Sequence, residues 1–484
     1  MLNRHLLGYL PVYLAQILVG FGGVVVFTRL LEPEDYGRYT LILAAMMLAE
    51  TVLFTWLNAA VARYHARSAA RGRIGGHTFT IFRIYALVAV GAAIVLGLTV
   101  WLAPIGGELK AALAFAVAAL VFRGGMDMAL ETRRAAGQVG RFAFLQTFSL
   151  TAGFALGVVL ILAGGLGTAG IFAGLALAAF MACVIDFPIL LKGARRDRAG
   201  PRRGLAFAAY GAPVAFSLVF EQLLATGDRF LIAAFLGEAA TGAYAAGYGI
   251  TDRSLNIMFV WLGAAATPLA IAALERQGRA AAQDMAKQAA ALMGLIGFPA
   301  AAGLALVAEP FARLLIAEAL AADAASIMGW IALGSLLNGI MTYFFHEAFI
   351  LGRKPARMAG LMVAGAVLNI ALNLLLIPAL GLVGAAVATV IAYGVSLVAC
   401  AVAGRFVFPL KLPVEDWTKA ALATAVMAML LIALPAPDSA LLHLLSHVIA
   451  GASVYGALAI LLDIAGCRSA MALPLIRRFA GARP

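Results

Sequence analysis

The chain consists of long apolar runs that are interrupted only by short polar joints. A run of roughly 20 mostly apolar residues can cross a bilayer as a helix. Hydrophobic residues make up 64% of the 484 positions and charged residues only 12%, and a soluble core could not bury so much apolar surface. We therefore expect an all-α polytopic membrane protein with about fourteen transmembrane helices. The predicted spans lie near residues 6–29, 39–62, 80–103, 111–131, 142–164, 168–191, 206–235, 243–272, 288–308, 327–351, 358–377, 382–404, 418–434 and 441–463.

The basic residues predict the orientation. They gather in alternate joints, which is the positive-inside pattern of a membrane protein. These joints are therefore expected in the cytoplasm together with both termini, and the first apolar run, which lacks a cleavage site, is expected to stay as a helix. A nucleic-acid binder would gather its net charge of +12 on one water-facing surface instead. The basic joints are 63–73, Arg133 with Arg134 and Arg141, 192–203, 276–287, 353–357, and Arg477 with Arg478.

The sequence offers no signature of an enzyme. It has no GxxxxGK[ST] phosphate loop and no HExxH or other metal-ligand spacing, so no cofactor or metal is expected. Cys183, Cys400 and Cys467 all fall on the predicted cytoplasmic side, where thiols stay reduced, and they are interpreted as packing residues. The longest outward segment, 309–326, is too short for a catalytic domain.

An internal repeat organises the chain. The first joint, LEPEDYGRY at Leu31–Tyr39, matches LGEAATGAY at Leu236–Tyr244 in its leucine, glycine and tyrosine, and GTAG at Gly167–Gly170 matches GLVG at Gly381–Gly384. Each copy holds six predicted helices, an even number, so the repeat is parallel. We predict six-helix bundles at 1–204 and 205–410 around a central cavity, followed at 411–484 by two extra helices and a cytoplasmic tail.

Three stretches carry a family resemblance: LLEPEDYGRY, the segment Asp228–Ile232 with the LGEAATGAY that follows it, and LNIALNLLLIPALGLVGAAVAT at Leu368–Thr389. Together they resemble the polysaccharide-export proteins, the Wzx-type flippases of the MOP superfamily. The resemblance implies translocation of an undecaprenyl-pyrophosphate-linked oligosaccharide across the bacterial inner membrane, by alternating access, for O-antigen, capsule or exopolysaccharide synthesis. It also implies a cationic cavity, ion coupling in many members, and partnership with polymerase and assembly proteins. A multidrug exporter of the MATE type and a glycan polymerase or ligase are the alternatives.

Ionisable residues inside apolar spans are costly and usually face a bundle interior or a cavity. The functional interpretation assigns the arginines to the pyrophosphate, because guanidinium binds phosphate oxygens bidentately. The carboxylates are then candidates for ion coupling, and two asparagines for lining the cavity and binding sugar. The candidates are Arg123, Arg229 and Arg253, then Glu50, Asp127, Glu221 and Asp252, then Asn58 and Asn338.

A structural interpretation competes with each assignment. Arg123 could pair with Asp127 one turn along its own helix, and the Asp228–Arg229 pair could neutralise Asp252–Arg253 across adjacent helices. Glu50 and Glu221 show no local counter-charge. We expect His346–Glu347 to be a solvated gate position near the cytoplasmic surface. The four asparagines, Asn58, Asn338, Asn369 and Asn373, are expected to form hydrogen bonds between helices.

Overall fold

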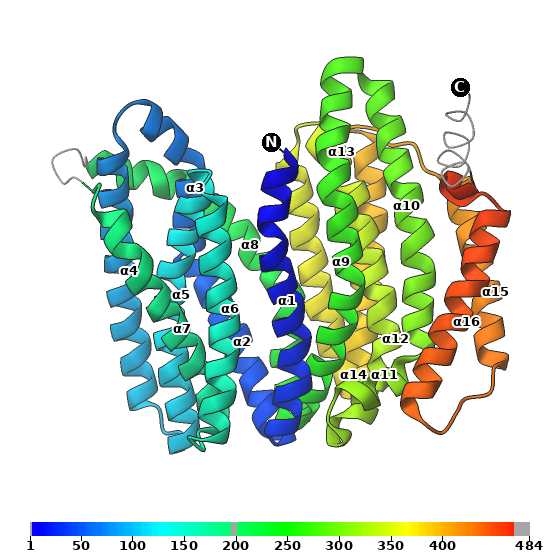
Figure 1. The fold of residues 1–484 in the computed structure, drawn as a ribbon, viewed down its shortest axis with the longest axis horizontal. Helices are drawn as coiled ribbons and strands as arrows, with labels where there is room; N and C mark the ends of the chain where they lie inside the picture. The colour runs from blue at the N-terminus through cyan, green and yellow to red at the C-terminus, as the bar shows by residue number, and fades with distance from the viewer. Residues whose placement is uncertain (1, 195–200, 469–484) are drawn as a thin grey trace, which may run out of the picture. The chain divides into compact units, whose positions relative to one another are not determined.

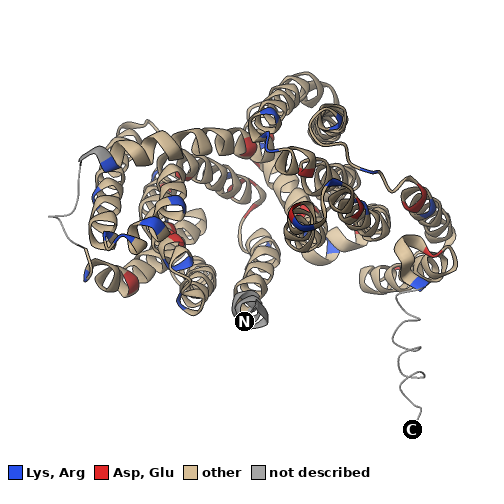
Figure 2. Cartoon of the chain, turned by 90° about the horizontal axis from the view of Figure 1, so that it is seen from above, with Lys and Arg blue, Asp and Glu red and all other residues tan. Residues whose placement is uncertain are grey.

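The computed structural model describes residues 2–194 and 201–468. Part of the basic joint at 192–203, and both Arg477 and Arg478, lie outside the described residues. The chain divides into two compact units, Met1–Gly242 and Ala243–Pro484 (Figure 1). Figure 2 shows that long stretches of helix in either unit carry no charged residue. The predicted boundary between 204 and 205 concerns the sequence repeat and stays a prediction.

The first unit contains α1 to α8 and the first residues of α9. These helices are α1 (Leu2–Leu30), α2 (Pro33–Leu53), α3 (Thr55–Ala70), α4 (Ile74–Leu102), α5 (Gly107–Ala135), α6 (Val139–Leu162), α7 (Gly167–Leu191) and α8 (Pro201–Leu236). The second unit contains α9 (Glu238–Gln277), α10 (Arg279–Leu306), α11 (Ala308–Leu315), α12 (Glu318–Ile340), the π-helix η2 (Met341–Phe345), α13 (Glu347–Leu351), α14 (Pro355–Arg405), α15 (Val414–Ala433), α16 (Ala440–Leu461) and the 3₁₀-helix η3 (Ile464–Gly466).

The predicted spans all coincide with helices. Within the described residues, 12 helices are long and apolar enough to cross a membrane, and α2 with α3 form one further span that bends by 44°. The 51 residues of α14 are about 76 Å long if helical throughout, more than twice the apolar thickness of a bilayer. The backbone leaves helical geometry at Gly381, with φ 62° and ψ −140°. This break separates the two spans predicted at 358–377 and 382–404, and the all-α polytopic membrane fold is thereby confirmed.

Large apolar side chains cover much of the outer surface of each unit. Leu98 and Trp101 on α4, and Leu375 and Ile432 in the second unit, are more than half exposed. A lipid bilayer is the solvent in which such a surface is stable. The interior of the first unit is packed with side chains such as Phe54, and the arrangement is that of a multi-pass membrane protein.

The two matching motifs of the sequence repeat, at Leu31–Tyr39 and Leu236–Tyr244, contact each other through their residues in the first unit. A Cβ atom on Gly37 would overlap the backbone of Glu238, and one on Gly242 would lie 2.9 Å from the carbonyl oxygen of Pro33. Nearby, Arg38 Nε donates a hydrogen bond of 2.6 Å to Glu238 Oε2. Only glycine permits this close approach of two backbones, which explains the glycine that the two motifs share.

The bend at Phe54 positions one of the candidate site residues. Phe54 ends α2 with φ −121° and ψ −26°, and its amide donates to the Glu50 carbonyl oxygen at 2.9 Å. The Phe54 ring lies so close to Gly124 of α5 that a Cβ there would clash with it. Because the ring fills this contact, α2 lies against α5 one turn before the break, where the Glu50 side chain projects.

Candidate functional site

A charged cluster lies between α2 and α5 in the first unit. Arg123 Nε donates a hydrogen bond of 3.3 Å to Glu50 Oε2. The side chains of Arg123 and Glu50 are 26% and 15% exposed, so both are mostly removed from solvent. Glu50 has no counter-charge near it in sequence, and its partner lies 73 residues away on α5.

Asp127 completes this cluster. It lies one turn after Arg123 on α5 and interacts with the charge on Arg123. Its carboxyl group also lies close to the Glu50 carboxyl. Two neighbouring carboxylates disfavour each other's charge, whereas a guanidinium favours it. The three side chains are therefore a candidate unit for binding a proton or a cation.

A second charged cluster on α5 was not identified from the sequence. Arg133 donates to Asp186 of α7 through Nε and Nη2, both at 2.9 Å, and Arg141 of α6 donates to the same carboxylate through Nε at 2.9 Å. A further hydrogen bond of 2.6 Å joins Arg133 Nη1 to Gln138 Oε1. Asp186 is fully buried. These residues link three helices. The only sequence signal was that Asp186 is a single acidic residue near the end of a predicted span, at the end where the basic joints lie.

The other candidates of the first unit lie on α8. Glu221 is exposed and Asp228 is buried. The backbone amide of Arg229 donates to Asp228 Oδ1 at 2.8 Å, and Arg229 Nε is buried without a hydrogen-bond partner among the described residues. Asp252 and Arg253 belong to the second unit, so their predicted pairing with Asp228 and Arg229 stays a prediction.

Two polar candidates of the second unit have hydrogen-bond partners within that unit. Ser335 Oγ of α12 donates to Asp252 Oδ1 of α9 at 2.8 Å. Asn338 Oδ1 accepts a hydrogen bond of 3.3 Å from Thr342, four residues along. In the first unit, Asn58 Oδ1 is buried and has no partner among the residues described. The sugar-binding role of Asn58 and Asn338 stays a prediction.

The other two asparagines correct an expectation. Asn373 Nδ2 donates to the Asn369 carbonyl oxygen at 2.9 Å and to Asn369 Oδ1 at 3.0 Å. Both residues are on α14 and almost fully buried. The prediction of hydrogen bonds between helices is wrong for this pair, because side chains four positions apart lie on the same helix face and satisfy each other there.

His346 and Glu347 are not solvated, contrary to expectation. Both are buried, and Glu347 accepts a hydrogen bond from Thr267 of α9. They follow the π-helix Met341–Phe345, in which the extra residue per turn rotates the following side chains into the bundle. Their position near the cytoplasmic end of the predicted span indicated that both side chains would be exposed. The π-helix changes the direction of these side chains and buries them.

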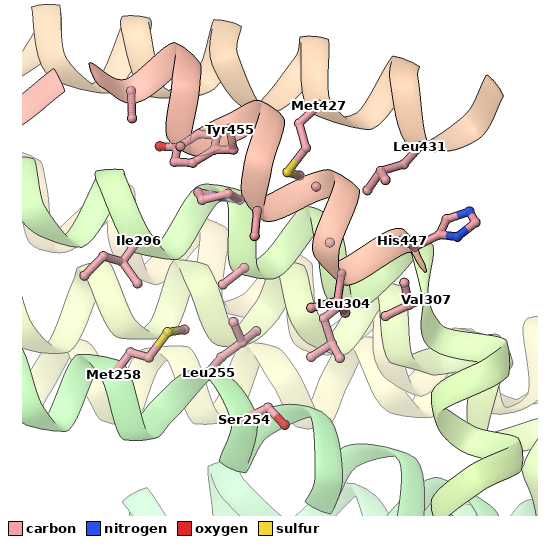
Figure 3. A pocket seen from close by; sticks show the side chains of 18 of the residues that line it. Ser254, Leu255, Met258, Ile296, Leu304, Val307, Met427, Leu431, His447 and Tyr455 are labelled. Atoms are coloured by element: carbon pink, nitrogen blue, oxygen red, sulfur yellow. The ribbon is translucent and has the colours of Figure 1, made fainter. Parts of the chain in front are cut away.

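An apolar groove runs along α16 in the second unit (Figure 3). Its volume is about 840 Å³, and side chains of α9, α10, α11 and the α15–α16 hairpin line it. The lining residues of α16 extend from Leu444 to Ile460, a length of about 24 Å. Met258 and Ile296 lie on one wall and Met427 on the other. The groove thus has the length and chemistry to hold a hydrocarbon chain across most of a bilayer.

The described residues hold no group of three or more His, Cys, Asp or Glu side chains arranged to bind a metal. The free cysteines Cys183 and Cys400 are buried and Cys467 is half-buried. The structure therefore offers two candidate sites, a cluster of charged side chains in the first unit and an apolar groove in the second.

Comparison with known proteins places the chain. A family model described as "Polysaccharide biosynthesis protein" matches residues 6–273, whereas no curated protein matches in sequence. The lipid II flippase MurJ in an inward closed conformation has a TM-score of 0.79 at 12% identity, and the match covers 95% of this chain and 99% of that one. An inward-facing multidrug resistance MATE family transporter of the MOP superfamily has a TM-score of 0.69 at 15% identity, over 81% and 94% of the two chains. A MOP superfamily transporter from Pyrococcus furiosus gives 0.61 at 15% identity, over 83% and 93%.

Proposed function

Because the chain belongs to the polysaccharide biosynthesis protein family, we propose that it flips an undecaprenyl-pyrophosphate-linked oligosaccharide across the bacterial inner membrane. The fold is that of MOP superfamily transporters, and no catalytic step is required. The cargo has an apolar tail, an anionic pyrophosphate and a polar glycan. Each part needs a different surface: the groove of the second unit is apolar, and the α2–α5 cluster of the first unit carries a guanidinium.

The apolar groove is the observation that carries the proposal. Its lining is almost entirely apolar, and the α15–α16 hairpin forms one wall. A polyprenyl chain is stabilised there because burying apolar area contributes about 25 cal/mol per Å². The MATE transporter match covers 81% of the chain and the MurJ match 95%, and additional helices of this kind favour a lipid-linked cargo over a small cation.

The α2–α5 cluster suits the pyrophosphate and its coupling to an ion. In the described part of the chain only Arg123 Nε is engaged, by Glu50, so the other guanidinium nitrogens can bind phosphate oxygens. An anion that binds Arg123 competes with Glu50 for the guanidinium. The Glu50 carboxylate then loses its counter-charge and is stabilised by taking up a proton or a cation. Substrate binding and ion binding are thereby linked at one site.

The remaining candidates complete this scheme. Arg229 and Arg253 supply further positive charge, while Glu221 and Asp252 are the carboxylates that would share ion coupling. Asn58 and Asn338 would bind sugar hydroxyls. Alternating access follows from movement of the two units, with the basic joints and both termini in the cytoplasm.

Mass spectrometry of lipid-linked glycans in cells depleted of the protein tests the proposal. We expect an undecaprenyl-pyrophosphate oligosaccharide to accumulate while the matching surface polymer disappears, and the accumulated glycan identifies the cargo as O-antigen, capsule or exopolysaccharide. Unchanged lipid-linked pools together with new sensitivity to cationic dyes would support a MATE-type exporter instead.

The groove has its own test in matched tryptophan variants. Ala452 lines the groove on α16 and its neighbour Ser453 does not. Ala452→Trp fills part of the groove, so the polyprenyl chain of the cargo can bury a few methylene groups fewer there. We therefore expect glycan export to fall at least tenfold while membrane insertion is unchanged. Ser453→Trp adds the same side chain on the exposed face and is expected to export normally. Equal export by the two variants would remove the groove from the mechanism.

A further inference from the structure

A cluster of basic side chains outside the proposed transport site lies where α3, α4 and α8 meet in the first unit. His65 is on α3, His77 in the first turn of α4 and Arg203 near the start of α8. The two imidazole rings are 5.9 Å apart in an edge-to-face arrangement. Arg203 lies close enough to His77 for its positive charge to act on the imidazole. His77 is 1% exposed and His65 is 8% exposed.

The polar atoms of this cluster are unusually unsatisfied. Among the described residues, both ring nitrogens of His77, Nδ1 of His65 and Nη1 of Arg203 are buried without a hydrogen-bond partner. A buried polar group without a partner destabilises the fold, and native proteins leave few of them. Four such atoms in one place indicate a missing ligand.

No described acidic residue can neutralise the cluster. The sequences of α3 and α4 contain no Asp or Glu, and the first acidic residue of α8 is Glu221, about 27 Å along the helix from Arg203. The acids of the neighbouring helices already have basic partners. Glu131 pairs with Arg134 at 2.7 Å, Asp186 with Arg133 and Arg141 at 2.9 Å, and Asp127 with the Glu50–Arg123 pair.

The backbone of α4 adds to the positive field. Its first turn contains Gly75 and Gly76, both buried, and the N-cap residue Arg73 makes no side-chain hydrogen bond to it. The first amides of a helix lack intrahelical acceptors, and the helix dipole attracts anions to this end. His77 is in the same turn, so two independent features favour an anion at one place.

We propose that His65, His77, Arg203 and the first turn of α4 bind a phosphate group. A membrane phospholipid would present one here, since Leu87 on α4 and Leu205 on α8 are 67% and 74% exposed and such apolar side chains are stable against acyl chains. Tyr210 lies nearby under the Arg63 guanidinium at 5.8 Å, and tyrosine is frequent at the membrane–water interface. Free phosphate has the same chemistry and is distinguished below.

The test is lipid binding to the full-length protein in dodecyl maltoside, followed by native mass spectrometry. The probe is phosphatidylglycerol, and the control lipid is a galactosyl diacylglycerol with the same acyl chains and no phosphate. His77→Phe keeps the ring contact with Phe207, 5.3 Å away, and removes both nitrogens, while Arg203→Gln removes the charge. We expect each variant to weaken phosphatidylglycerol binding about tenfold, because each loses a charge-assisted hydrogen bond.

A matched variant and a second ligand make the outcome decisive. Arg67→Gln changes the same charge at an exposed position of α3 and should bind phosphatidylglycerol like the wild type. Competition by inorganic phosphate at millimolar concentration would show that the site takes phosphate from either source, and binding of inorganic phosphate alone would identify the free anion. The proposal is overturned if His77→Phe and Arg203→Gln bind phosphatidylglycerol and phosphate as the wild type does.

Discussion

Asp186→Asn is the substitution whose effect the structure predicts best. The fully buried carboxylate accepts three hydrogen bonds, two from Arg133 and one from Arg141. An asparagine keeps one acceptor oxygen and turns its amide toward a guanidinium. Arg141 is 33% exposed and can reach water, whereas Arg133 is 9% exposed and cannot. Removing one partner of a buried pair costs about 3–5 kcal/mol of stability. Because Arg141 can turn to water, we expect a cost at the lower end, about 3 kcal/mol.

The assay uses the thiol of Cys183, which lies one turn before Asp186 on α7. The thiol is buried and donates to the Phe122 carbonyl oxygen at 3.4 Å, so a thiol-reactive dye reaches it only when α7 separates from α5. Cys400→Ala and Cys467→Ala remove the other two thiols. With closing faster than labelling, the labelling rate follows the opening equilibrium. A cost of about 3 kcal/mol therefore accelerates labelling about 100-fold.

Glu131→Gln is the matched control for this measurement. Glu131 pairs with Arg134 at 2.7 Å on the same helix, and that arginine is 57% exposed. Such a pair contributes about 0–1 kcal/mol, so labelling should change less than about fivefold. If Asp186→Asn were labelled no faster than Glu131→Gln, the argument that Asp186 joins the three helices would be refuted.

Two further predictions concern the first unit. Gly37→Val should lower the yield of folded protein and reduce the free energy of unfolding by about 1–3 kcal/mol or more, because its Cβ overlaps the Glu238 backbone. Thermal unfolding in detergent measures this change. Gly91→Ala is the control, since a Cβ there meets nothing within 4 Å, and its stability should be unchanged or slightly raised. Arg123→Gln should stop glycan export in protein that inserts normally, and it should destabilise wild type more than it destabilises Glu50→Gln. A double-mutant cycle by thermal unfolding gives this coupling, and zero coupling would contradict the ion pair.

The sequence predicted the spans because the bilayer imposes a single length on every apolar run. Even the break in α14 was predicted, since the Pro378–Gly381 region interrupts the apolar run and Gly381 adopts a φ of 62° that glycine tolerates. The division of the 39–62 span into α2 and α3 was not predicted. Phe54 is a good apolar residue, and the bend arises from its packing against Gly124, a contact between distant segments.

The polar site was harder to predict because pairing depends on helix rotation, which apolar runs do not encode. The sequence offered Asp127 as the partner of Arg123, but the hydrogen bond of Arg123 is to Glu50 on α2, and Asp127 interacts with it only through charge. Asp186 was overlooked because a single carboxylate near the end of a span resembles an interfacial residue. His346 and Glu347 were misplaced because a π-helix changes the side-chain phase and has no simple sequence signature.

Two arginines on α5 illustrate how satisfaction of hydrogen bonds separates structural from functional charge. Arg133 has all three guanidinium nitrogens engaged, by Asp186 and Gln138, and its side chain is only 9% exposed, so it is held in place and shielded from a ligand. Arg123 makes a single bond of 3.3 Å within the described residues and remains 26% exposed. Lysine cannot reproduce the fork of Arg133, so Arg133→Lys should accelerate labelling of Cys183 and reduce export only through loss of folded protein. Arg123→Lys should leave labelling unchanged and reduce export directly, and the opposite pattern would reverse the two assignments.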